Sequence, residues 1–230
     1  MVLQKTNYSE SSLIIKLLTA DQGIKSFIFK GGRTPKKKGN IISPLAMVSI
    51  EYYGRSESDL QNISDVELAH VFKTIPFDPR KTAILFFMNE VLLNAVHDQE
   101  DSAEVYSFVL DALKHLDKAE HVANFPVKFL VDLMRHLGLF PNVVKLDGYF
   151  DLKESTYVSS VPTHPMHMPK DRSLLVLEIS GMKFDEISQV TIDLDNRRQL
   201  IHELLAYYHI VLDKWKDIRS LAVLEAALHA

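Results

Sequence analysis

The chain of 230 residues contains no cysteine. The absence of thiols excludes disulfide bonds, thiol catalysis and every zinc site built on cysteine ligands. No uninterrupted apolar run approaches the ~18 residues that span a bilayer. Residues 1–6 also lack the charged and then apolar order of a signal peptide. These absences favour a protein of the cytoplasm that has no part in a membrane.

The signatures of common enzymes are also missing. Gly31 and Gly32 fit neither the dinucleotide nor the phosphate-loop spacing, and no HExxH, GxSxG or kinase-type set occurs. His164 and His167, with Asp171 nearby, do not make up the four ligands that a structural zinc ion needs. We therefore expect no enzymatic activity, no cofactor and no metal.

Positive charge is concentrated in the first part of the chain, although the whole carries a net charge of −4 at pH 7. Residues 1–38 hold eight basic and two acidic side chains, a balance of +6. Residues 81–230 hold 15 basic and 22 acidic side chains, a balance of −7. A basic head on an acidic body is typical of a localised site for a polyanion.

Residues 30–38 carry five cations within nine positions. The flanking glycines and Pro35 disfavour a helix there, and repulsion between like charges favours an exposed loop. Such a loop suits a phosphate backbone, because each contact releases condensed counterions; the simpler interpretation is a solvated hairpin tip. The predicted DNA-binding residues are Lys16, Lys25, Lys30, Arg33, Lys36, Lys37, Lys38 and Arg55.

Alternating apolar residues indicate strands in the first 65 or so residues. Residues 12–18, 24–29 and 47–53 are predicted strands, and residues 60–63 could supply a fourth. Short strands separated by turn residues, with little helix, favour a small barrel of about five strands.

Two alternatives exist for the aromatic residues of this barrel. Phe27 and Phe29 either fill its core, which general burial habits favour, or stack on bases. The same preference for the core applies to Tyr8 and Tyr52. The prediction of binding therefore rests on the cations.

The apolar period changes to that of helices beyond residues 76–80. The predicted helices cover residues 84–95, 105–116 and 126–137, resume near Met182, and run again over residues 196–228. We predict an α+β chain with a barrel domain over residues 1–78 and a mostly helical domain over residues 79–230. An irregular, cysteine-free insert is expected at about residues 145–172.

Several short segments are familiar in their order and spacing. They are YSE at residues 8–10, LTADQG at 18–23, KGGR at 30–33, PL at 44–45, FLVDLMRHLGLFP at 129–141, RR at 197–198, YYH at 207–209 and SL at 220–221. Together they resemble the RecO family of bacterial recombination mediators, over nearly the whole chain. The resemblance implies that the barrel is an OB-fold.

The family resemblance also implies function. It implies binding of single- and double-stranded DNA and strand annealing. It further implies loading of RecA together with RecR, and contact with the acidic C-terminal tail of the single-stranded-DNA-binding protein. Many members carry a four-cysteine zinc module after the Leu-Gly helix, whereas residues 146–169 contain no cysteine. A metal-free loop or hairpin is expected there, with no role for zinc.

One helix is a candidate surface for the acidic tail. Lys128, Phe129, Leu133 and Arg135 could form an apolar pocket rimmed by cations, and a plain amphipathic core helix explains the same pattern. The function predicted for the whole chain is that of a non-enzymatic DNA-binding mediator in recombinational repair. The alternatives are an RNA- or tRNA-binding module and a protein-interaction scaffold.

Overall fold

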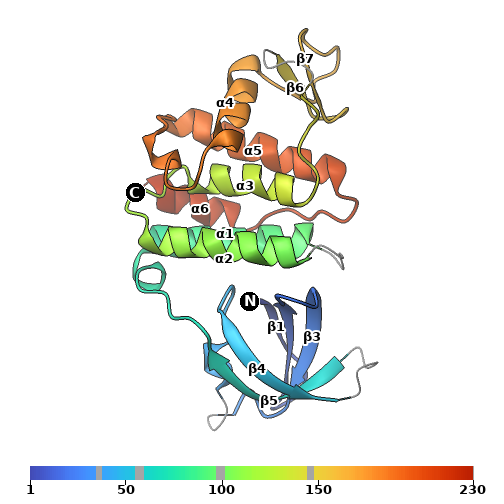
Figure 1. The fold of residues 1–230 in the computed structure, drawn as a ribbon, viewed down its shortest axis with the longest axis vertical. Helices are drawn as coiled ribbons and strands as arrows, with labels where there is room; N and C mark the ends of the chain where they lie inside the picture. The colour runs from blue at the N-terminus through green and yellow to red at the C-terminus, as the bar shows by residue number, and fades with distance from the viewer. Residues whose placement is uncertain (35–37, 55–59, 97–101, 144–147, 230) are drawn as a thin grey trace.

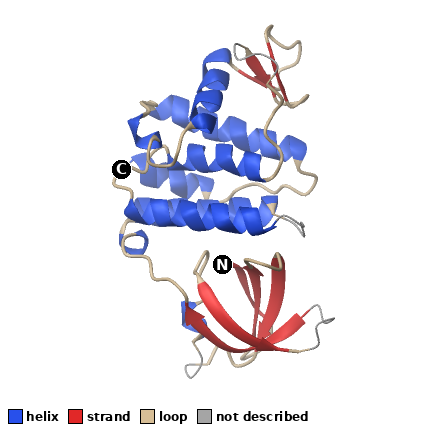
Figure 2. Cartoon of the chain, in the orientation of Figure 1, coloured by secondary structure: helices blue, strands red, loops and turns tan. Residues whose placement is uncertain are grey.

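The protein is divided into a β-sheet part and a helical part that follow one another along its long axis (Figures 1 and 2). The computed structural model describes residues 1–34, 38–54, 60–96, 102–143 and 148–229. Within these ranges, no helix has both the length and the apolar character to cross a membrane.

Five strands form the N-terminal sheet: β1 (Val2–Asn7), β2 (Leu13–Leu18), β3 (Ile24–Phe29), β4 (Val48–Tyr53) and β5 (Leu60–Leu68). Their order is β1-β2-β3-β5-β4, with β3 and β5 parallel and the other neighbours antiparallel. The N–H of Val2 donates to Ala46 O (3.0 Å) and that of Leu45 donates to Val2 O (2.8 Å), which joins β1 to the start of β4. The sheet is thus a partly open five-stranded barrel, and the predicted fold is confirmed.

The first strand was not recognised in the sequence. Only Val2 and Leu3 of β1 are buried, and residues 4–7 are polar and exposed. The register also shifts between Val2 and Gln4, which interrupts the alternation of faces. A strand with this pattern has no period of two to detect.

The core of the barrel contains the phenylalanines. Phe27 and Phe29 are 2% and 0% exposed, and Ile15 packs in the same cluster. The preferred prediction for the two phenylalanines is confirmed. The same expectation was wrong for Tyr8 and Tyr52, which are 61% and 42% exposed.

Local geometry explains the two exposed tyrosines. Tyr8 lies in the turn between β1 and β2, outside the sheet. The ring of Tyr52 is on the side of Phe27, with 5.2 Å between ring centroids, but an extra residue on β5, Ser64, disturbs the pairing between the partners Glu51–Asp65 and Tyr52–Ile63. Neither feature is visible in a period-two reading of the sequence.

The described residues of the helical part form six α-helices: α1 (Pro79–Ala95), α2 (Ser102–Lys118), α3 (Phe125–His136), α4 (Lys170–Gly181), α5 (Leu194–Val211) and α6 (Leu221–His229). Three short 3-10 turns accompany them: η1 (Gly39–Ile41), η2 (Ile75–Phe77) and η3 (Ile187–Gln189). Asp78 caps α1 by accepting from the N–H of Arg80, and Pro79 occupies the first helical position. The apolar stripes predicted α1, α2 and α3 at nearly these bounds.

Two helix predictions were wrong. A helix was expected to begin near Met182, but α4 ends there. It starts directly after Pro169, inside the segment that was expected to be irregular. Apolar residues crowd several sides of α4, so no stripe marks it in the sequence. The single helix expected over residues 196–228 is divided into α5 and α6. Glu90 of α1 fixes the start of α6, because its carboxylate accepts from the N–H (2.8 Å) and hydroxyl (2.6 Å) of Ser220.

The cysteine-free insert forms a small sheet of β6 (Tyr149–Asp151), β7 (Thr156–Val158) and β8 (His167–Met168), in the order β7-β6-β8. The rings of Phe150 and Tyr157 stack at 5.2 Å between centroids. The buried Ser173 hydroxyl accepts from the N–H of Phe150 (2.8 Å) and donates to Pro169 O (2.8 Å). Among the described residues, no group of three or more potential ligands could hold a metal ion.

One of the two hydrophobic clusters spans both parts of the chain. Met1, Leu18 and Met47 of the barrel are buried in the same cluster as the helices. The end of the barrel that carries Met1 therefore faces the helical domain, with α1 and α2 nearest to it (Figure 1). Leu18 pairs with Ile24, so the basic segment begins at the opposite end of β3, after Phe29.

Candidate nucleic-acid interface

The segment after β3 leaves the barrel through a narrow neck. A Cβ atom built on Gly39 would lie 1.8 Å from the main-chain oxygen of Gly32. The two glycines therefore lie in backbone contact, and a side chain at position 39 would force them apart. The basic segment is thus held at its base by close packing.

Arg33 fastens this neck to the turn between β1 and β2. Its main-chain N–H donates to Ser11 O (3.0 Å), and its Nη1 donates to Ser9 O (2.8 Å). The Thr34 hydroxyl donates back to Gly31 O (2.7 Å). The guanidinium of Arg33 is therefore anchored through Nη1, while the residue as a whole is exposed to solvent.

A hollow of about 520 Å³ opens beside the neck. It is lined by Lys5, Asn7, Leu13, Gly32, Arg33, Thr34, Gly39 and Asn40. The described residues of the lining provide two cations, two amides and a hydroxyl, and none of them is a carboxylate. This combination of donors suits a phosphate group.

The sequence predicted only part of this hollow. Arg33 was among the predicted DNA-binding residues, whereas Lys5, Asn7 and Asn40 were not. The register pairs Lys5 with Ile15 and Asn7 with Leu13, which places both β1 side chains on the face toward the neck. Recognition of β1 as a strand is the signal that would have found them.

The structure does not bring Lys16 and Lys25 together on one track. The pairing of β2 with β3 places Lys16 opposite Ser26 and Leu17 opposite Lys25. Adjacent positions of a strand point to opposite faces, so Lys16 and Lys25 lie on opposite faces of the sheet. Lys25 also precedes Lys30 by five residues, about 16 Å along a strand. The predicted continuous track is therefore not formed at Lys25.

Lys38 is already engaged by acids of the barrel. Its Nζ lies 3.0 Å from Glu67 Oε1 and 3.3 Å from Asp65 Oδ2. These hydrogen bonds, first that to Glu67 and then that to Asp65, raise the pKa of the Lys38 ammonium. All three side chains remain substantially exposed, so a stronger ligand can compete for the lysine. Lys36, Lys37 and Arg55 lie outside the described residues.

The predicted tail-binding pocket on α3 does not exist as an open surface. Phe129 and Leu133 are fully buried and Lys128 is 2% exposed. Lys128 Nζ lies 2.6 Å from Asp132 Oδ1 and 5.5 Å from the centroid of the Phe184 ring. Three of the four residues thus belong to the core, as the alternative of an amphipathic core helix requires.

Arg135 is the only one of these four residues that is exposed. Its Nη2 donates to the hydroxyl of Ser180 (2.9 Å), and its guanidinium lies 4.3 Å from the centroid of the Phe140 ring. The α3 helix therefore presents a cation at its C-terminal end without an adjoining apolar pocket made by Phe129 and Leu133.

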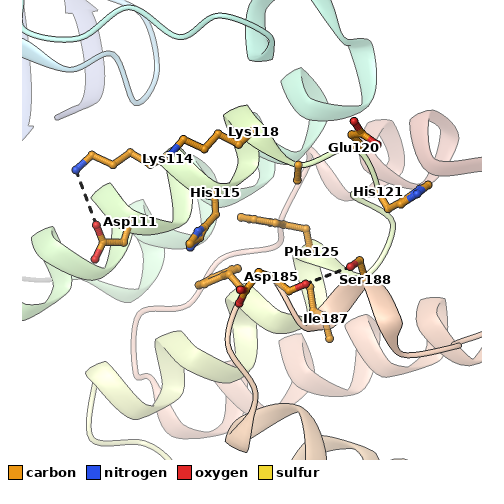
Figure 3. Close-up of a pocket in the computed structure, with 12 residues that line it drawn as sticks. Asp111, Lys114, His115, Lys118, Glu120, His121, Phe125, Asp185, Ile187 and Ser188 are labelled. Carbon is orange, nitrogen blue, oxygen red and sulfur yellow. Dashed lines mark hydrogen bonds and ion pairs between the residues drawn. The ribbon is translucent and has the colours of Figure 1, made fainter.

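A different hollow of about 660 Å³ lies where α2, the start of α3 and η3 meet (Figure 3). Lys114, His115 and Lys118 of α2 stand along one side, while Phe125 and Ile187 supply apolar surface (Figure 3). Acidic side chains of Asp111, Glu120 and Asp185 also border it. In the sequence, the exposed face of α2 is indistinguishable from a solvated helix, because η3 is brought against it only by the tertiary fold.

Two family models match the chain in succession. The model described as "Recombination protein O N terminal" matches residues 1–72, and "Recombination protein O C terminal" matches residues 76–220. The chain belongs to the RecO family. Its members are recombination mediators without enzymatic activity, and the resemblance carried by the short motifs is confirmed over residues 1–72 and 76–220.

Individual RecO proteins are similar to the chain over nearly all of their length. The "DNA repair protein RecO" of Flavobacterium psychrophilum is 28% identical over 234 residues, which are 98% of this chain and 95% of that protein. The proteins of the same name from Flavobacterium johnsoniae and Phocaeicola vulgatus are 27% and 26% identical, each with 98% and 95% covered.

Proposed function

We propose that this RecO-family chain binds DNA in recombinational repair, with the hollow beside the neck as its phosphate site. The observation that carries the proposal is the placement of Lys5 and Arg33 in a hollow with no carboxylate among the lining residues that the structure describes. Phosphate contacts carry no sequence information, so binding is tolerant of sequence. Single- and double-stranded DNA both offer the phosphates that the hollow can hold.

The charges of the barrel restrict where a strand can lie. Glu51 and Asp65 are opposite one another on β4 and β5, and Glu67 follows on the same face. These carboxylates repel phosphates, whereas the outer positions of β1, β2 and β3 carry no acidic residue. The backbone of a bound strand therefore runs beside β1 and the neck, away from the β4–β5 side.

The test is the affinity of a double variant for a single-stranded oligonucleotide. Lys5→Gln with Arg33→Gln removes both cations and keeps a side-chain donor for Ser9 O. Two phosphate contacts on a single strand release about 0.7 counterion each, so we expect affinity to fall about 60-fold at 50 mM salt. The slope of log affinity against log salt should decrease in magnitude by about 1.4. Fluorescence anisotropy over a salt series measures both.

A matched variant controls for net charge. Lys153→Ala with Lys170→Ala also removes two cations, from the region of the small β6–β8 sheet at the far end of the molecule (Figure 1). It should bind like the unchanged protein. Equal losses in the two double variants would overturn the assignment of the hollow, and a complete lack of retention by the unchanged protein at low salt would overturn DNA binding itself.

A second expected result concerns Lys38. In the proposed complex a phosphate takes the lysine from Asp65 and Glu67, so these acids oppose binding. Asp65→Asn with Glu67→Gln should raise the magnitude of the salt slope by about 0.7 and the affinity about eightfold at 50 mM salt. The same anisotropy series reports the change.

The same acid substitutions made in a Lys38→Gln protein show whether their effect on affinity depends on Lys38. In that background the two acid substitutions should have almost no effect, because no lysine is left to release. Glu51→Gln removes a neighbouring charge that is not among the ion-pair partners of Lys38 in the described part of the chain. Suppose that Glu51→Gln raised the affinity by half as much as the Asp65→Asn, Glu67→Gln variant. The negative charge of this region as a whole, and not the ion pair with Lys38, would then be what opposes binding.

The partners proposed with DNA are RecR and the acidic C-terminal tail of the single-stranded-DNA-binding protein, with strand annealing and RecA loading as the outcome. RecR, RecA loading and annealing are supported by the family alone. For the tail, the hollow of Figure 3 offers the cations of α2 beside the apolar Phe125 and Ile187. A labelled tail peptide should lose affinity when Lys114 and Lys118 are replaced. If only the replacement of Arg135 lowered the affinity of the peptide, the tail site would instead lie on α3.

Competition separates the repair function from the RNA-binding alternative. An unstructured DNA strand should displace a folded tRNA from the protein at equal nucleotide concentration. Preferential retention of the tRNA would favour the RNA-binding module. Retention of neither nucleic acid at low salt would favour a protein scaffold.

A further inference from the structure

A second hollow, of about 830 Å³, adjoins the hollow of Figure 3 and differs from it in charge. Asp111, His115 and Asp185 border both hollows, so the two meet along the exposed side of α2 (Figure 3). Lys183 is the one ammonium among its described lining residues, which include the four carboxylates of Glu104, Asp111, Asp132 and Asp185. We call this the acidic hollow, and the binding of DNA phosphates gives it no role, because carboxylates repel phosphates.

Three segments that are distant in the sequence build the acidic hollow. The α2 side chains at positions 104, 108, 111 and 115 have the spacing of a single helix face. Asp132 and His136 belong to α3, and Phe184 and Asp185 belong to the segment that follows α4. The tertiary fold therefore gathers these charges around a concave surface, unlike the solvated face of one helix.

Aromatic rings lie among the carboxylates. The ring of Phe108 stacks on that of His136, with 4.5 Å between centroids and 25° between planes. The ring of Phe184 lies 5.7 Å from that of His115. Phe108 is buried, whereas the other three residues keep part of their surface exposed. The hollow thus offers ring surface beside negative charge, which is the combination that a guanidinium group prefers.

The protein already uses this combination for one of its own cations. Lys128 Nζ lies 2.6 Å from Asp132 Oδ1 and 5.5 Å from the centroid of the Phe184 ring. The lysine is buried at this place and neutralises the carboxylate of Asp132. One of the four carboxylates is therefore matched from inside the protein.

The other carboxylates of the hollow have no strong partner. In the described part of the chain, no ion pair is recorded for Glu104 or Asp185. Asp111 Oδ1 lies 4.0 Å from Lys114 Nζ, and these side chains are 73% and 48% exposed, so the pair contributes little. Lys183 is exposed as well. Negative charge thus remains in excess, and charge complementarity favours a cationic occupant.

The length of the hollow favours a peptide over a small cation. Glu104 and His115 are eleven residues apart on α2, about 16 Å along the helix axis, which is the reach of about five residues of an extended chain. Beyond His115 the surface continues to the apolar side chains of Phe125 and Ile187. A peptide can place a cation among the carboxylates and an apolar side chain against Phe125 at the same time.

We propose that the acidic hollow is a docking site for an arginine-bearing segment of a partner protein. The guanidinium lies over the rings of His136 and Phe184 and donates to the carboxylates next to them. Its planar fork of N–H groups matches both a ring face and a carboxylate better than an ammonium does. DNA and the acidic tail are both anionic, so this inference does not depend on the proposed function.

The test uses labelled peptides of four arginines, four lysines and four citrullines, without DNA. Citrulline has nearly the shape of arginine and no charge, so tetra-citrulline should not bind. Asp111→Asn with Asp185→Asn removes two exposed carboxylates and keeps the size of both side chains. The loss of two ion pairs should weaken the binding of tetra-arginine by about 5- to 30-fold. Fluorescence anisotropy measures the affinities.

Phe184→Leu tests the contribution of the ring. The preference for tetra-arginine over tetra-lysine should fall by about 2- to 5-fold, because leucine offers no π-face. Circular dichroism shows whether this variant is folded. Should it fail to fold, His136→Leu asks the same question at a half-buried ring. An unchanged preference in the folded variant would overturn the stacked guanidinium.

A matched variant controls for net charge. Asp213→Asn with Asp217→Asn removes two exposed carboxylates from the connection between α5 and α6, and it should bind tetra-arginine like the unchanged protein. Equal losses in the two double variants would overturn the acidic hollow as the site. Equal binding of tetra-citrulline and tetra-arginine would overturn recognition by charge.

A polyamine competitor tests the choice of a protein segment as the occupant. Spermine and tetra-arginine carry the same number of side-chain or amine charges, but spermine has no planar group. We expect much more spermine than peptide to be needed for displacement. Displacement of tetra-arginine by an equal or lower concentration of spermine would overturn the protein partner in favour of a polyamine.

Discussion

Replacing Asp117 with alanine is expected to lower the free energy of unfolding by about 3–5 kcal/mol. Asp117, near the end of α2, accepts hydrogen bonds from the main-chain N–H groups of Lys73 (2.9 Å), Thr74 (2.8 Å) and Ile75 (3.0 Å). These three residues lie in the connection between the barrel and α1. Alanine leaves all three donors without their partner in a partly buried place.

The buried Lys81 adds to the expected loss. Its Nζ donates to the main-chain oxygen of Asp117 (3.0 Å) and to the Thr74 hydroxyl (2.6 Å), and the lysine is only 4% exposed. The Thr74 hydroxyl also donates to the main-chain oxygen of Asp117. Movement of the connection away from α2 therefore weakens the hydrogen bonds of a buried ammonium as well.

Urea denaturation followed by circular dichroism measures the effect. Asp111→Ala, at an exposed position of the same helix, should change the free energy of unfolding by no more than about 0.5 kcal/mol. Asp117→Asn keeps one acceptor oxygen and should fall between the two. A loss below about 1 kcal/mol in Asp117→Ala would mean that the connection is held by apolar packing alone.

The same carboxylate makes stability depend on acid pH. Burial of Asp117 opposes its ionisation, but the N–H groups of Lys73, Thr74 and Ile75 outweigh burial and lower its pKa. A group with a lowered pKa in the folded state stabilises the fold above its unfolded pKa, about 3.9 for aspartate, and loses that contribution as pH falls further. Asp117→Asn should therefore flatten the loss of stability below about pH 4 relative to the unchanged protein.

This contact matters for function because it fixes the barrel against the helices. The connection is held at Asp117, and Met1 and Leu18 are buried against the helical core. The barrel that carries the hollow beside the neck is consequently packed and hydrogen-bonded to the helical part that carries the hollow on α2.

The sequence predicted those parts of the fold that depend on local periodicity. The strands β2 and β3 alternate apolar and polar residues, and α1, α2 and α3 carry apolar stripes. Each of these elements can therefore be predicted from its own residues. The strand β1 and the helix α4 do not. The first is polar over residues 4–7, and the second has no single apolar face, so both depend on tertiary contacts that a local pattern does not contain.

The candidate site divides in the same way. Arg33 was predicted because glycine and like charges place it in an exposed loop. Lys5 enters the site only through the register of β1 with β2, and Lys38 is engaged by acids on β5, a strand about thirty residues further on. Register and long-range ion pairs set which cations act together, and neither can be read from composition or spacing.

Lys128 was predicted to bind a partner, and its surroundings lead to a different expected result. Lys128→Ala should lower the free energy of unfolding by about 3–5 kcal/mol, because it leaves the partly buried Asp132 without its cation. The two groups are 2.6 Å apart, and the lysine side chain is 2% exposed. Thermal or urea denaturation measures the loss directly.

A second variant separates charge from packing at this site. Lys128→Met with Asp132→Leu replaces the ion pair by apolar groups of similar size, which is often neutral or stabilising. We expect it to recover most of the stability lost in Lys128→Ala. A double variant as unstable as Lys128→Ala would mean that the hydrogen bond itself is required.

The recovered variant then decides between the structural and the partner-binding role. It is folded but carries no cation at position 128, so a tail peptide that needs Lys128 should lose affinity for it. A peptide that docks in the hollow on α2 should bind it as it binds the unchanged protein, because neither Lys128 nor Asp132 lines that hollow. Since Lys128 is buried under the Phe184 ring, we expect unchanged peptide binding together with restored stability.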